Sequence, residues 1–248
     1  MPSHVIDVDD IRPLERPEAV NVARHEYDRY LDQLRSLSDR DWLRGTDCPP
    51  WTVRDMAAHV LGQTEFIASI RQAVHQRRAS ARELGIRQDA VNEIQIRERA
   101  GLTPAEIIRG LSVAAPASIR ARRRLPGLVR RIRVSPEPSL SERWTLAYLF
   151  DVIFTRDTWM HRIDTARAAG VELVLTREHD GRIVEDIVAD WARRLRTPFE
   201  LELAGPAGGS YRFGSPGERL ELDAVDFCRL LSGRGAGSDG LLATLVPF

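Results

Sequence analysis

One short pattern recurs three times in the first 170 residues and marks where helices begin. A threonine or serine is followed three positions later by an acid at Thr52–Asp55, Thr103–Glu106 and Ser139–Glu142. In this arrangement the two side chains pair with backbone N–H groups that the first helical turn leaves without partners. An apolar run with steps of three and four residues follows each copy. The pattern therefore predicts a helix start at each of these places.

A further periodic run lies upstream of the first copy, so the sequence predicts four long helices. They cover residues 17–37, 52–80, 103–120 and 139–170. The last ends at Gly170, and glycine is the residue type favoured just beyond a helix C-terminus. Four long helices of this kind predict a four-helix bundle.

The pattern changes after Gly170. A predicted helix over 176–196 leads to "FELELAG", in which Phe199, Leu201 and Leu203 alternate with glutamates, the period of a half-buried strand. "YRF" and "ERLEL" predict further strands, and "DAVDFCRLL" predicts a helix capped by Asp223 and ended by Gly233.

We therefore predict an α+β fold class in two domains. Residues 1–170 form an N-terminal four-helix bundle, and residues 171–248 form a small α+β C-terminal domain.

Composition narrows the classes of function. The 248 residues are 43% hydrophobic and 29% charged, and the formal net charge is zero. This balance suits a globular protein and gives no general attraction to nucleic acid or to an anionic membrane. No apolar run approaches the roughly 20 residues that span a bilayer, and the N-terminus lacks the pattern of a signal peptide. We expect a cytoplasmic protein with neither nucleic acid nor membrane as a partner.

The basic residues and the cysteines exclude several chemistries. All 36 basic residues are arginine, since the sequence contains no lysine. That excludes a Schiff base, a lysine nucleophile and a Walker-type phosphate loop. The two cysteines, Cys48 and Cys228, form no Cys-x-x-Cys metal or redox motif.

Two other segments carry weaker signals. Residues 122–133 contain six arginines, which suit either a polyanionic ligand or, more commonly, a solvated basic loop. The stretch "GAGSDG", Gly235 to Gly240, matches the G-x-G-x-x-G pattern. It follows a predicted helix rather than a strand, and few residues come after it. We interpret it as a glycine-rich loop and not as a dinucleotide site.

The fourth predicted helix turns three ionisable residues in one direction. Asp157 and His161 are four residues apart and therefore lie on one helix face, with Asp164 one turn further along. Phe150 and Phe154 continue the same stripe. A stripe of this composition faces a bundle interior, where unpaired charge is costly, so we expect a compensating group.

The second predicted helix offers a partner in His59, which lies among apolar residues almost all round the helix. Two histidines and a carboxylate from facing helices make a three-ligand site for zinc or a similar divalent metal, with one coordination position open. Asp164 would then orient a ligand or cap a backbone group. Two alternatives remain. His59 can be a satisfied core histidine, and the aspartates can pair with Arg156, Arg162 or Arg167.

The segments "CPPWTVRDMAAHVLG" (48–62) and "RDTWMHRIDTARAAG" (156–170) resemble the two signature stretches of the mycothiol-dependent maleylpyruvate isomerase family, whose bundle belongs to the DinB-like superfamily. In the first stretch the resemblance lies in Trp51, Asp55 and His59. It covers nearly the whole chain and includes, more loosely, the "LLSGR" segment that ends at Arg234.

The resemblance implies a divalent metal, usually zinc, held by His59, Asp157 and His161. The family has a glutamate at the position of Asp157, and this departure bears on metal affinity and geometry. Mycothiol is the implied thiol cosubstrate.

The implied reaction is either the cis-trans isomerisation of a maleylpyruvate-like unsaturated acid or a mycothiol S-transfer. Arg234 is the candidate catalytic and cofactor-binding residue from the C-terminal domain, because a guanidinium suits a carboxylate. A helix cap or a surface ion pair is the other reading of Arg234. The alternative function is a non-catalytic small-molecule-binding protein that retains the bundle. We expect a monomer or a weak homo-oligomer.

Overall fold

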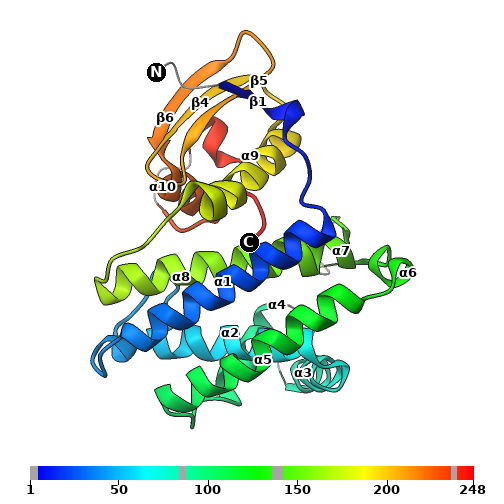
Figure 1. Cartoon of the computed structure of the whole chain (residues 1–248), viewed down its shortest axis with the longest axis vertical. Helices are drawn as coiled ribbons and strands as arrows, with labels where there is room; N and C mark the ends of the chain where they lie inside the picture. Colours follow the sequence, from blue (N-terminus) through cyan, green and yellow to red (C-terminus); the bar gives the residue numbers. More distant parts are fainter. Residues whose placement is uncertain (1–4, 84–87, 136–141, 236–238) are drawn as a thin grey trace. The chain divides into compact units, whose positions relative to one another are not determined.

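The structure is a computed structural model and describes residues 5–83, 88–135, 142–235 and 239–248. The chain divides into two compact units. One comprises Glu15–Glu172, and the other comprises Met1–Leu14 together with Leu173–Phe248 (Figure 1). The first unit is helical and the second holds a small mixed sheet, so the α+β fold class is confirmed.

Four long helices form the core of the first unit. Each of α1 and α2 contacts both α5 and α8, which closes a four-membered bundle. Their interior is apolar and includes Tyr27, Leu34, Leu61 and Leu111. The bounds of the four are α1 (Arg16–Ser36), α2 (Val53–Ala68), α5 (Pro104–Arg124) and α8 (Phe154–Ala169).

Shorter elements complete this unit. Helices α3 and α4 pack against α2 and against each other. Two residue pairs form a small two-stranded antiparallel sheet ahead of the last helix. The shorter elements are η2 (Asp41–Leu43), α3 (Ile70–Glu83), α4 (Gln88–Arg97), α6 (Gly127–Arg130), β2 (Arg133–Val134), β3 (Trp144–Thr145), α7 (Leu146–Tyr148) and the π-helical turn η3 (Leu149–Ile153).

The capping pattern located two helix starts correctly. Thr52 and Asp55 form a reciprocal capping box at α2, and Thr103 and Glu106 form another at α5. Gly170 ends α8 with a φ of 67°, in the left-handed region that glycine adopts at little cost.

Two predicted helices differ from the structure. The predicted helix over 52–80 breaks at Ser69, whose φ of −144° and ψ of 119° are extended. Its hydroxyl accepts a hydrogen bond from the N–H of Gln72 in α3, and this cap starts a new helix. The helix predicted to begin at Ser139 starts instead at Leu146, where Thr145 is the cap. Ser139 itself lies outside the described residues.

The second unit is a four-stranded sheet covered by helices. The strand order is β1-β5-β4-β6, with β4 antiparallel to β5 and parallel to β6. Trp191 of α9 lies between Phe199 of β4 and Phe227 of α10, with ring centroids 4.5 and 5.3 Å away. The elements are β1 (Val5–Asp7), η1 (Val8–Asp10), η4 (Arg177–Gly181), α9 (Arg182–Leu195), β4 (Phe199–Ala204), β5 (Gly209–Phe213), β6 (Glu218–Asp223), α10 (Ala224–Leu231) and η5 (Gly240–Ala243).

The alternation predicted for β4 is present, since Phe199, Leu201 and Leu203 are buried and their neighbours are exposed. The N-terminal segment differs from the predicted division, which placed residues 1–14 with the bundle. Val5–Asp7 pairs in parallel with β5 and so belongs to the second unit. Three residues with no strand-length pattern become a strand only through this long-range pairing.

Among the described residues, no helix combines the length and the apolar character that crossing a membrane requires.

Candidate metal centre

Helix α2 brings His59 into the bundle interior. The capping box at Thr52 fixes where the helix starts, and the helix is apolar almost all round, so nearly every residue after its first turn is buried. The His59 side chain is only 1% exposed. Neither of its ring nitrogens makes a hydrogen bond among the described residues, although Nε2 lies at ion-pair distance from Asp157. A buried imidazole in this condition needs a further polar partner.

Helix α8 supplies the facing side chains. Asp157 and His161 are four residues apart and point the same way, as the spacing predicted. His161 is buried, whereas Asp157 is half-buried. The predicted aromatic stripe is also present, since the rings of Phe150 and Phe154 lie 5.5 Å apart.

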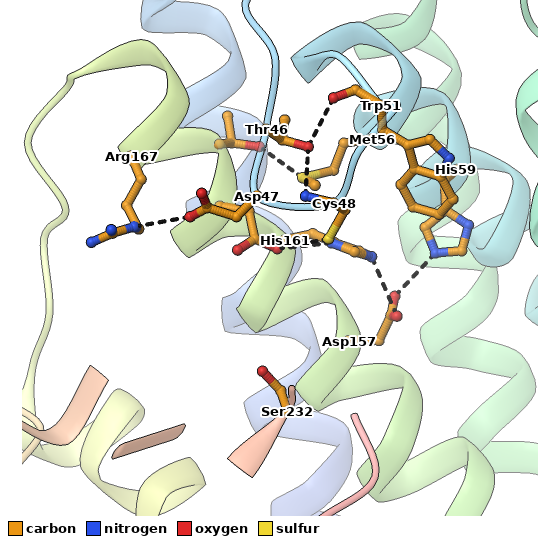
Figure 2. A network of polar contacts seen from close by, with 12 residues as sticks. Thr46, Asp47, Cys48, Trp51, Met56, His59, Asp157, His161, Arg167 and Ser232 are labelled. Carbon is orange, nitrogen blue, oxygen red and sulfur yellow. Dashed lines mark hydrogen bonds and ion pairs between the residues drawn. The ribbon is translucent and has the colours of Figure 1, made fainter. Parts of the chain in front are cut away.

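The carboxylate of Asp157 lies between the two imidazoles (Figure 2). Its Oδ2 is 3.4 Å from Nε2 of His59, and its Oδ1 is 3.4 Å from Nε2 of His161. The two rings are 5.1 Å apart and nearly perpendicular, at 89°. One ligand atom from each of the three residues can be chosen so that all lie within 4.8 Å of one another.

The ionised form of the Asp157 side chain is strongly favoured. Burial raises the pKa of Asp157, but the combined effect of the neighbouring His161 and His59 side chains lowers it, and the net pKa lies well below its ordinary value. The side chain is therefore an anion at neutral pH.

Trp51 covers both imidazoles from the loop before α2. Its ring centroid lies 5.2 Å from that of His59 and 6.0 Å from that of His161. The loop is closed by an isolated bridge between Gly45 and Thr52, and the hydroxyl of Thr46 donates to the carbonyl of Trp51 at 2.9 Å. These contacts fix the backbone of Trp51 beside the site.

Asp164 lies on the far side of the His161 ring. Its Oδ2 is 3.4 Å from Nδ1 of His161, and the Cys48 thiol lies 3.7 Å from the same oxygen. Asp164 is completely buried. A carboxylate beside Nδ1 favours the tautomer in which Nε2 carries the free lone pair.

The three residues fit a divalent metal. Two imidazole nitrogens and a carboxylate oxygen are a standard donor set for zinc. Two ligand atoms at tetrahedral angles around zinc lie about 3.3 Å apart, close to the distance from each imidazole nitrogen to the Asp157 oxygen that faces it. Of the three arginines predicted as alternative partners of the aspartates, Arg162 and Arg167 pair with other carboxylates, and the pairing with Arg156 stays a prediction. Arg162 contacts Glu26 at 2.7 Å and Arg167 contacts Asp47 at 3.1 Å.

Arg234 lies in the second unit. It lies just after α10, where its N–H donates to the carbonyl of Arg229 and its own carbonyl accepts from the Arg229 side chain. The predicted anion-binding role of Arg234 stays a prediction.

The basic segment over 122–133 is only partly a solvated loop. Arg122 belongs to α5, is buried, and donates to the hydroxyl of Thr155 at 2.8 Å. Arg130 pairs with Asp151. The other arginines of the segment are exposed, as a solvated basic surface requires.

Two residues of the cluster were missed from the sequence. Gln63 donates from Nε2 to Oδ2 of Asp157 at 2.8 Å. Its position four residues after His59 was an available signal, because that spacing shares a helix face. The sequence predicted only that Cys48 belongs to no Cys-x-x-Cys motif, and no spacing rule connects a loop cysteine with Asp164, which is 116 positions away.

The chain thus contains a helical bundle in which facing helices bring two imidazoles and a carboxylate together. This arrangement is typical of metal-binding helical bundles. The model of one family, the mycothiol maleylpyruvate isomerase N-terminal domain, matches residues 23–166. This match covers more than half of the chain, and the chain belongs to that family.

Solved structures agree on the fold. The chain is similar to the crystal structure of the mycothiol-dependent maleylpyruvate isomerase, with a TM-score of 0.60 and 18% identity over 95% of this chain and 94% of that one. A histidine-to-alanine mutant of that enzyme matches with the same TM-score, 17% identity, and coverage of 94% and 93%. No curated protein matches the chain.

Proposed function

We propose that this chain is a metal-dependent enzyme that uses a low-molecular-weight thiol, mycothiol, as its nucleophile. His59, Asp157 and His161 would hold the ion, with Zn²⁺ as the metal that best suits the donor set. The observation that carries this proposal is the convergence of the three side chains, each nitrogen 3.4 Å from the carboxylate. Membership of the mycothiol maleylpyruvate isomerase family supports the choice of thiol.

The chain's own residues have distinct parts in this proposal. His59 and His161 offer neutral nitrogens, and Asp157 offers one negative charge, so a divalent ion would keep a net positive charge. Asp164 orients His161 from the Nδ1 side. Trp51 packs against the two imidazoles from the loop before α2. When bound, the ion supplies a positive charge that stabilises a thiolate at neutral pH.

A thiolate held in this way serves two reactions. In an isomerase, the sulfur adds to an activated cis double bond, the resulting single bond rotates, and elimination returns the trans isomer with the thiol unchanged. In an S-transferase, the sulfur stays attached to the electrophile and the thiol is consumed. Arg234 is proposed to bind a carboxylate of the substrate or of the thiol.

Calorimetry with mycothiol tests the proposal. The protein is prepared with metal and, after dialysis against a chelator, without it. We expect binding to the metal-loaded form and at least about tenfold weaker binding to the metal-free form. Equal affinity in both forms would exclude a metal-held thiol. Protein that takes up no divalent metal would favour the non-catalytic binding protein.

A second assay separates the two reactions. The loaded enzyme is mixed with mycothiol and a maleylpyruvate-like acid, and both the trans product and the free thiol are measured over time. Trans product with constant thiol identifies the isomerase, and thiol loss equal to product identifies the transferase.

A further inference from the structure

Gln63 contacts the candidate metal centre from the same helix as His59. It lies one turn after His59 on α2 and is 4% exposed. Its amide Nε2 donates to Oδ2 of Asp157 at 2.8 Å, which is shorter than either histidine contact to that carboxylate. The amide oxygen Oε1 is buried without a hydrogen-bond partner among the described residues, so the Asp157 contact fixes which way the amide faces.

This contact bears on how Asp157 is oriented. A carboxylate side chain rotates about two bonds, and a metal site requires one orientation. The Gln63 amide engages Oδ2, the oxygen that also faces His59, while Oδ1 faces His161. A carboxylate held at one oxygen presents the other in a fixed direction. Ligating carboxylates are commonly oriented by hydrogen bonds of this kind.

We infer that Gln63 is a positioning residue for Asp157 and sets the affinity of the site for a divalent metal. The inference rests on the proposed function. Gln63 does not coordinate the ion. It acts through the Asp157 carboxylate, which it keeps directed at the space between the two imidazoles. Where the aspartate is replaced by the longer glutamate, we expect the carboxylate to move away from this amide and the contribution of Gln63 to disappear.

The test compares two single variants by chelator-competition titration with Zn²⁺. Gln63→Met keeps the length and lack of branching of the side chain and removes the amide donor. Thr64→Val is the matched control, because Thr64 is completely buried on the same helix and its hydroxyl bonds to the Val60 carbonyl at 2.7 Å. We expect Gln63→Met to weaken Zn²⁺ binding by roughly 10- to 100-fold and Thr64→Val by less than about threefold.

A second background separates positioning from a general structural role. Gln63→Met is also made in Asp157→Glu protein, where we expect it to change the Zn²⁺ dissociation constant by less than about threefold. An equal loss in both backgrounds would mean that Gln63 supports only the fold of α2 and would overturn the inference. Gln63→Met binding Zn²⁺ as tightly as Thr64→Val would overturn it as well. Wild-type protein that binds no Zn²⁺ would contradict the proposed function and the inference together.

Discussion

The imidazole rings of His59 and His161 come from different helices and stand nearly perpendicular, with centroids 5.1 Å apart. The carboxylate of Asp157 lies 3.4 Å from Nε2 of each. This relationship places three donor groups around one small volume inside the bundle.

The length of the side chain at position 157 should affect how tightly the site binds a divalent metal. Asp157 already reaches both imidazoles and the Gln63 amide, so the backbone of α8 is adjusted to aspartate. We expect Asp157→Glu to weaken divalent-metal binding by about tenfold, because the longer side chain overfills the site and leaves the amide. Chelator competition measures the change. Asp55→Glu, the same substitution in the capping box of α2, is the control and should leave affinity unaltered. A markedly tighter glutamate variant would show that the natural site is a weakened one.

The capping boxes should contribute measurably to stability. Thr52→Ala and Thr103→Ala each leave an N–H group of the first turn without its side-chain acceptor. We expect each to lower the free energy of unfolding by about 1 kcal/mol, measured by urea denaturation. The Thr→Ser variants keep the hydroxyl and should lose little. Serine variants as unstable as the alanine variants would rule out the cap as the cause.

Breaking the buried ion pair between Glu26 and Arg162 should lower the free energy of unfolding far more than breaking an exposed ion pair. Their side chains are 1% and 3% exposed and approach to 2.7 Å. Glu26→Leu leaves a buried guanidinium without this partner and should destabilise the protein by about 3–5 kcal/mol. Asp32→Asn, which breaks the exposed Asp32–Arg35 pair, should have little effect in the same urea titration. Similar effects for the two variants would contradict the burial argument.

Local signals in the sequence predicted the parts of the fold that depend on local interactions. The caps at Thr52 and Thr103 and the left-handed Gly170 depend on neighbouring residues, and all three are present. Strand β1 was missed, because three residues acquire strand structure only by pairing with β5 about 200 positions away. The break at Ser69 was missed because apolar residues continue at steps of three and four on both sides of it.

In the candidate site too, local spacing predicted some features, and other features depend on contacts between distant segments. The spacing of Asp157 and His161 predicted a shared helix face, which the structure has. His59 was added from its apolar surroundings, with the family resemblance in support. The spacing of Gln63 from His59 indicated a shared helix face but not the contact with Asp157 on the facing helix. Trp51 and Cys48 owe their positions around the cluster to loop closure, which no spacing in the sequence specifies.

Metal content tests the central claim most directly. Wild-type protein and the His59→Ala, His161→Ala and His75→Ala variants are loaded with Zn²⁺, desalted and analysed by mass spectrometry for bound metal. His75 is the control, since it lies on α3 and contacts Glu98 at 2.6 Å outside the cluster. We predict about one ion per chain in the wild type and in His75→Ala, and loss of most of it in the other two variants. Full metal content in both His59→Ala and His161→Ala would contradict the assignment of these histidines as ligands.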